Sequence, residues 1–271
     1  MTNEQEARRR AEAFRERFEI GTRPLGDLFE LVHDTVGCDV LAMSADGAEH
    51  GLSMADPLSG RAVIAVAITE HPMRQRSSIA HELGHILAGD VDRELDHPPG
   101  VRSDEEIQAD AFARHLLLPL AAVSPHGADV AVDEAWLSHL VQEFCVSPHI
   151  AAIQLKDARL IDDDTSQQWS RFRAGTVAAR YGWLSQYQAM SAASSQPRAP
   201  QSLMRRAAEG YRIGVLGIAE LSAWYGVPAE ILDAELELSA ATDDAGSTVG
   251  HDWDEDAPLL PPGFAPPSPS S

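Results

Sequence analysis

The chain has 271 residues, 44% of them hydrophobic, which is enough for one well-packed core and a smaller helical unit. Its formal net charge is −21, with 20 arginines and a single lysine, and this charge argues against direct binding to a nucleic-acid backbone. The two cysteines lie outside any Cys-x-x-Cys pattern, and the sequence shows neither a signal-peptide pattern nor an apolar run of about 18 residues. We therefore expect a cytoplasmic protein without a membrane segment.

The first predicted elements are helices followed by two strands. A charged helix over residues 1–20 is expected as an N-terminal unit, and the helical pattern resumes up to residue 36. Two apolar runs, 38–43 and 62–68, predict strands that are joined through a loop with turn signals. If the second strand lies at a sheet edge, an extended substrate could pair with it.

Residues 81–85 read His-Glu-Leu-Gly-His and lie in a segment with the apolar period of a buried helix. On a helix, His81 and His85 project from one face and can bind one metal ion. Glu82 lies beside them, where a carboxylate can take a proton from the attacking water. One of the serines at 77–78 is the expected N-cap. The alternative, a helix with two unrelated histidines, would bury polar groups that need partners.

A second helix, predicted over residues 103–119, offers a third metal ligand. Its Glu106 and Asp110 lie four residues apart and therefore share one face. Hydrolytic zinc sites use three protein ligands and keep one position open, so His81, His85 and one carboxylate satisfy the count. We expect Glu106 to be the ligand, and Asp110 to accept a hydrogen bond from the free ring N–H of a ligand histidine, His81 in preference to His85.

Other assignments for the third ligand stay open at this point. Glu106 could instead close a capping box with Ser103, and Glu105 or His97 could then supply the ligand. The extended three-histidine pattern fails, because alanine and valine occupy the positions of its glycine and third histidine. Four histidines could donate to an oxyanion, although each is more often a surface or structural residue: His71, His115, His139 and His149.

The remaining sequence predicts more helices, over residues 132–144, 148–159, 172–190 and 201–238. A stretch between them, 191–201, is predicted to be flexible, and the acidic, proline-rich end is predicted to be disordered. The expected units are 1–20, 21–165, 166–239 and 240–271. Two helical hairpins in this half share their apolar spacing, but neither has the basic cluster of a DNA-binding helix-turn-helix. We therefore expect these hairpins to pack against other helices.

Two segments contain the most specific motifs: RSSIAHELGHIL at 76–87, and Glu-x-x-Ala-Asp-x-Phe-Ala-x-x-Leu-Leu-Leu-Pro at 106–119. Together they resemble the ImmA/IrrE zinc metallopeptidases, over roughly residues 20–165. The resemblance implies an α+β fold: a mainly helical, zincin-like catalytic domain with a small antiparallel sheet, followed by a helical C-terminal region. It also implies that His81, His85 and Glu106 bind one zinc ion and that Glu82 is the general base. Many relatives have Asn at the position of Asp110, and either residue can accept the hydrogen bond.

The resemblance further implies a zinc-dependent metallo-endopeptidase that cleaves a helix-turn-helix repressor or another transcriptional regulator, which would be its protein partner. A His₂-carboxylate site also accepts Mn²⁺ or Fe²⁺. The alternative function is a metal-containing module that sequesters a regulator without cleaving it. Glu82 favours the enzyme, because a module that only binds has no need of a general base beside its metal.

Overall fold

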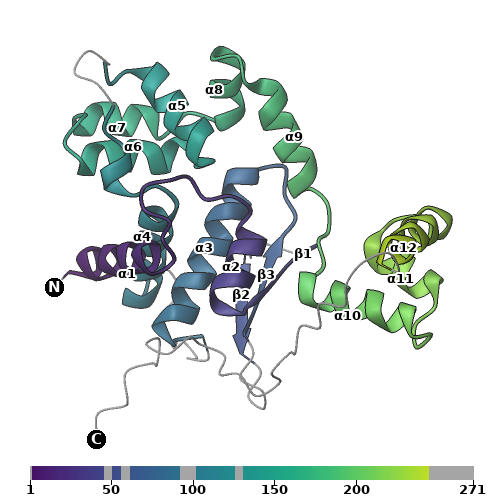
Figure 1. Cartoon of the computed structure of the whole chain (residues 1–271). Coiled ribbons are helices and arrows are strands. Elements are labelled where there is room, and N and C mark those ends of the chain that lie inside the picture. The colour runs from purple at the N-terminus through teal and green to yellow at the C-terminus, as the bar shows by residue number, and fades with distance from the viewer. Residues whose placement is uncertain (1, 46–50, 56–61, 92–101, 126–130, 244–271) are drawn as a thin grey trace, which may run out of the picture.

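A small sheet lies near the middle of the molecule, with helices around it (Figure 1). The computed structural model describes residues 2–45, 51–55, 62–91, 102–125 and 131–243. The strands are β1 (Asp39–Met43), β2 (Gly51–Ala55) and β3 (Ala62–Ala67). The α-helices in these residues are α1 (Asn3–Arg17), α2 (Leu28–Val36), α3 (Pro72–Ala88), α4 (Asp104–Leu117), α5 (Glu134–Phe144), α6 (Pro148–Asp157), α7 (Asp163–Trp169), α8 (Ala174–Arg180), α9 (Leu184–Ser194), α10 (Gln201–Arg212), α11 (Ile218–Tyr225) and α12 (Ala229–Asp243). The predicted, mainly helical α+β fold is confirmed. None of the described helices is long and apolar enough to cross a membrane.

The sheet is mixed, with β3 at its centre. β3 pairs with β1 in parallel and with β2 in antiparallel orientation. The predicted antiparallel pairing is confirmed for β2 with β3 but is wrong for β1 with β3, and the hypothesis that β3 is an edge strand is wrong. The reason is that the chain forms an additional strand, β2, between the two predicted ones. β2 runs antiparallel to β3, and this extra reversal leaves β1 and β3 parallel. The sequence of β2, Gly-Leu-Ser-Met-Ala, has none of the β-branched residues that signal a strand, so it forms by pairing with β3.

Helix α3 begins earlier than predicted. Its first residue is Pro72, whose fixed φ suits the first helical position, and His71 is the N-cap. The serine N-cap expected at 77–78 is therefore wrong: these serines lie inside the helix, and Ser77 Oγ donates to the carbonyl of Met73. The helix ends at Ala88 and is followed by its C-cap, Gly89, which adopts the left-handed conformation with φ of 71°. This early start places the His-Glu-Leu-Gly-His segment in the last three turns of the helix.

Helices α3 and α4 lie side by side and approach closely at Gly84. A Cβ atom at Gly84 would lie 3.1 Å from Cδ1 of Phe112 and 3.3 Å from Cα of Ala109. Phe112, Leu83 and Leu116 are almost completely buried around this contact. The absence of a side chain at Gly84 thus lets the two helices pack at a short distance.

Helix α1 is joined to α4 and α6 by a largely buried polar network. Glu4 pairs with Arg114, and Nε2 of His115 lies 2.6 Å from Oε1 of Glu4. Nδ1 of His115 lies 3.1 Å from the side-chain nitrogen of Gln154, and both residues are buried. The bond to His115, assisted by Arg114, lowers the pKa of Glu4 to about 2 despite the opposing effect of burial. α1 therefore shares one core with the helices that carry the motif.

The C-terminal helices form two groups. Helices α5 to α9 bury residues such as Leu140, Trp169 and Trp183 in the same core as α3 and α4. Residues 191–201, predicted to be flexible, are ordered: α9 continues to Ser194, and Arg198 pairs with Ala42 of β1. That pairing satisfies backbone groups at the outer edge of β1, which explains the order.

Helices α10 to α12 enclose a smaller apolar cluster, formed by Met204, Ala207, Leu221 and Leu232. α12 continues to Asp243, so the first residues of the region predicted to be disordered, 240–243, are helical instead. The rest of that prediction, 244–271, lies outside the described residues.

Candidate metal centre

Three potential ligand atoms converge where α3 faces α4. Nε2 of His81 lies 3.1 Å from Nε2 of His85, and the carboxylate oxygens of Glu106 lie 3.4 Å from each of these nitrogens. Tetrahedral zinc with bonds of about 2.0–2.1 Å places its ligand atoms about 3.3 Å apart. Among the described residues these three form the one His, Cys, Asp or Glu group that is close enough for a metal ion. Their donor types and spacing therefore fit zinc.

Two aspartates orient the histidines from behind. Nδ1 of His81 lies 2.7 Å from Oδ1 of Asp110, and Nδ1 of His85 lies 2.9 Å from Oδ1 of Asp90. When each neutral ring donates its Nδ1–H to an aspartate, both Nε2 lone pairs point into the same space. Two lone pairs 3.1 Å apart repel each other unless a cation lies between them. This arrangement is a second, independent reason why a metal ion fits here.

The two aspartates differ in origin and surroundings. Asp110 lies on α4, as expected, and its other oxygen pairs with Arg102. Asp90 follows the C-cap Gly89 of α3, and its side chain is only 8% exposed. Asp90 was not predicted. The one sequence feature that could have pointed to its contact with His85 is its position immediately after the glycine that ends the motif helix.

The carboxylates shift the titration of their partners. Burial would lower the pKa of His85, but the bond to Asp90 and the nearby carboxylates of Glu106 and Glu82 outweigh it and raise the pKa. Burial would likewise raise the pKa of Asp110, but His81 and Arg102 lower it. The site therefore has an excess of negative charge that a divalent cation would neutralise.

Strand β2 contributes to the site by fixing Glu82. Oε2 of Glu82 accepts a hydrogen bond of 2.8 Å from Oγ of Ser53, and both residues are buried. Gly51, two residues earlier on the same face of β2, leaves space for the carboxylate: a Cβ atom there would lie 2.8 Å from Oε1 of Glu82. Neither residue was predicted, because the sequence carries no strand signal in this segment.

Of the capping box that the sequence allowed between Ser103 and Glu106, the structure shows only the half in which Ser103 accepts from the backbone. The backbone N–H of Glu106 donates to Oγ of Ser103, the N-cap of α4, while the Glu106 carboxylate lies beside the histidines. The backbone cap thus holds the first turn of α4 and leaves the side chain available to a metal. Glu105 is not part of the group, and the weaker candidate His97 lies outside the described residues.

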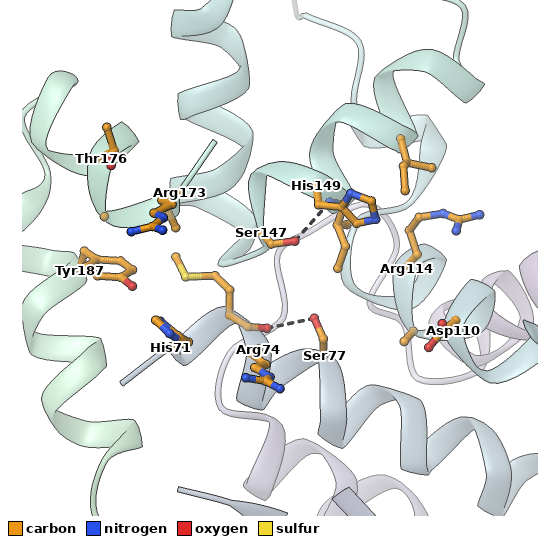
Figure 2. Close-up of a pocket in the computed structure, with 16 residues that line it drawn as sticks. His71, Arg74, Ser77, Asp110, Arg114, Ser147, His149, Arg173, Thr176 and Tyr187 are labelled. Carbon is orange, nitrogen blue, oxygen red and sulfur yellow. Dashed lines mark hydrogen bonds between the residues drawn. The ribbon is translucent and has the colours of Figure 1, made fainter. Parts of the chain in front are cut away.

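The four candidate oxyanion donors separate into two pairs. His115 is 2% exposed and occupied on both ring nitrogens, and His139 packs against Trp136 on the surface. These two are structural. His71 and His149 instead line a cleft that also contains Asp110 (Figure 2).

Comparison with known proteins agrees with this geometry. Residues 34–156 match the model of the IrrE N-terminal-like domain, the peptidase family M78. The match begins in α2 and ends in α6, so it includes the whole sheet, both motif helices and every residue of the candidate centre. No protein of curated function matches the chain. This match supports the predicted resemblance to the ImmA/IrrE family and a metallopeptidase-type function for residues 34–156.

Proposed function

We propose that the protein is a zinc-dependent metallo-endopeptidase that cleaves a regulatory protein. The observation that supports it best is the convergence of both Nε2 atoms and the Glu106 carboxylate at zinc-ligand spacing, with Glu82 held next to them by β2. By the family resemblance, the substrate is a helix-turn-helix repressor or a similar transcriptional regulator, and the protein itself does not contact nucleic acid.

Zinc bound by these ligands would supply a Lewis acid that lowers the pKa of water and polarises the scissile carbonyl. Glu82 would accept the proton of the attacking water and pass it to the leaving amine. Ser53 directs one carboxylate oxygen of Glu82 through its hydrogen bond, which leaves Oε1 free to take the proton. Asp90 and Asp110 would keep the two rings in the tautomer that presents Nε2.

The substrate would lie along the free edge of β2. β2 pairs with β3 on one side only and, among the described residues, no strand pairs with its other side. An extended peptide that added to this edge would run beside Gly51 and Ser53, the residues in contact with Glu82. The peptide would therefore pass the general base.

The alternative function is a metal-containing module that sequesters a regulator without cleaving it. Such a module needs the ligands but has no need to hold Glu82. The buried Ser53–Glu82 hydrogen bond and the glycine at position 51 favour the enzyme, because both constrain the one carboxylate that hydrolysis requires.

The test compares the wild type with Glu82→Gln. The zinc-loaded proteins are incubated with purified products of neighbouring genes, and new N-termini are identified by mass spectrometry. We expect Glu82→Gln to retain about one zinc per chain and to lose cleavage by roughly 10²- to 10⁴-fold. Normal cleavage by Glu82→Gln would refute the proposed mechanism.

A matched pair tests the ligand. Glu106→Ala should lose zinc in a metal-content measurement, whereas the adjacent Glu105→Ala should retain it. The reverse result would assign the ligand role to Glu105.

A further inference from the structure

A cleft of about 880 Å³ runs along the first half of α3 and reaches Asp110 (Figure 2). Asp110, which bonds to His81, forms part of its wall. Ser77, one helical turn before His81, forms another part. The opposite wall comes from α6, α8 and α9, with residues such as His149 and Tyr187. The cleft therefore borders the candidate metal centre through Asp110, the residue that supports His81.

The cleft is basic although the protein is strongly acidic. Three arginines and two histidines line it: Arg74, Arg114, Arg173, His71 and His149. Asp110 is its one acidic lining residue, and Arg102 and His81 already pair with that carboxylate. For a chain with a net charge of −21, this local excess of positive charge is the exception.

Two of the arginines have no partner within the described part of the chain. Arg114 is engaged by Glu4 and Gln154, but Arg74 and Arg173 make no ion pair or side-chain hydrogen bond with described residues, and both are exposed. They lie on different elements, the first turn of α3 and the N-cap of α8. Unpaired guanidinium groups on two sides of one cleft are suited to bidentate contacts with carboxylates.

Size and lining indicate which kind of anion fits. The volume is near the upper end of the roughly 300–1,000 Å³ typical of ligand sites, far more than an inorganic ion needs. Apolar side chains lie between the basic groups, among them Met73, Ile150, Ile153 and Tyr187. The ligand therefore combines carboxylates with apolar groups, as an acidic peptide does. A nucleic acid would need a longer basic surface than two free arginines.

We propose that this cleft binds an acidic segment of a protein substrate, with Arg74 and Arg173 contacting Asp or Glu side chains of that segment. Hydrolysis of that segment rests on the proposed function, but its binding does not. The two arginines are then specificity-determining residues, because a neutral segment would leave their charges without partners.

The experiment measures binding to the full-length, zinc-loaded Glu82→Gln protein, which cannot consume its ligand. The probe is a fluorescein-labelled dodecapeptide in which Asp and Glu alternate with Leu and Ala, and its control has Asn and Gln at the acidic positions. In fluorescence anisotropy we expect the acidic peptide to bind at least about tenfold more tightly than its control. Adding Arg74→Gln or Arg173→Gln should weaken binding by about three- to tenfold each.

Arg171→Gln is the matched control, since Arg171 is exposed and two residues from Arg173 but outside the cleft. It should bind the acidic peptide unchanged, and circular dichroism melts should show that all variants are folded. Equal affinity for both peptides, or an equal loss in Arg171→Gln, would overturn the inference.

The outcomes also separate the two proposals. If binding depends on the cleft arginines but the wild type does not cleave, the proposed peptidase function is refuted and the binding inference stands. If Arg74→Gln and Arg173→Gln cleave a regulator at an unchanged rate, the specificity role of these two arginines is refuted and the peptidase function stands.

Discussion

Replacement of Gly51 by alanine tests whether β2 positions Glu82, the proposed general base. The new Cβ would lie 2.8 Å from Oε1 and 3.1 Å from Cγ of Glu82, whereas carbon atoms in good contact are about 3.5–4.0 Å from their neighbours. The carboxylate must therefore move by roughly 0.7 Å or more. Since a misplacement of about 1 Å can reduce a rate by 10²-fold, we expect kcat to fall by about 10- to 100-fold.

The same substitution should leave the fold intact. Gly51 is not in the left-handed region, and alanine in a strand is favoured over glycine by about 0.5–1 kcal/mol. The assay combines kcat for the cleaved regulator with the zinc content and the melting temperature of each variant. Gly26→Ala is the control, because a Cβ at Gly26 meets no atom within 4 Å. Wild-type kcat in Gly51→Ala, or a loss of kcat that only parallels a loss of zinc or of folding, would refute the reasoning.

Two further predictions concern the metal and the N-terminal helix. Asp90→Asn should weaken zinc binding by about 10- to 100-fold in a chelator competition, because Asn holds the His85 ring less firmly; the exposed Asp34→Asn should not, and equal affinities would contradict the role of Asp90. The folded pKa of Glu4 is about 2, below its ordinary value of 4.5, so its stabilisation is present above about pH 4.5 and is lost as pH falls towards 2. Thermal melts should therefore show Glu4→Gln less stable than wild type at pH 7, with a difference that shrinks below pH 4.5. A constant difference over that window would exclude the Glu4 carboxylate as its cause.

The residues that the sequence could predict are those with a periodic pattern. His81, His85 and Glu82 share a helix whose apolar spacing is regular, and Glu106 with Asp110 repeats the four-residue spacing on the next helix. The structure places Asp110 against His81 and the Glu106 carboxylate near both rings, as the hypothesis of one shared site on two helices predicted.

The residues that escaped prediction depend on contacts between distant segments. Ser53 and Gly51 reach Glu82 because β2 pairs with β3, and nothing local in Gly-Leu-Ser-Met-Ala favours a strand. Asp90 reaches His85 only because Gly89 turns the chain back at the end of α3. The parallel pairing of β1 with β3 likewise depends on β2, an unpredicted strand that lies between them in the sequence. Sequence periodicity carries no information about such pairings.

The close approach at Gly84 has a consequence for the selection of the metal ion. Two candidate ligands come from α3 and the third from α4, so the distance between the helices sets how far Glu106 lies from the histidines. Gly84 is one of the two variable positions of the His-Glu-x-x-His motif, and a side chain there would press on Phe112 and Ala109. A residue without a functional group therefore contributes to the spacing of the three candidate ligand atoms. If a metal ion binds at this centre, we expect its selection to depend in part on helix packing, and a single methyl group at Gly84 to change it without touching a candidate ligand.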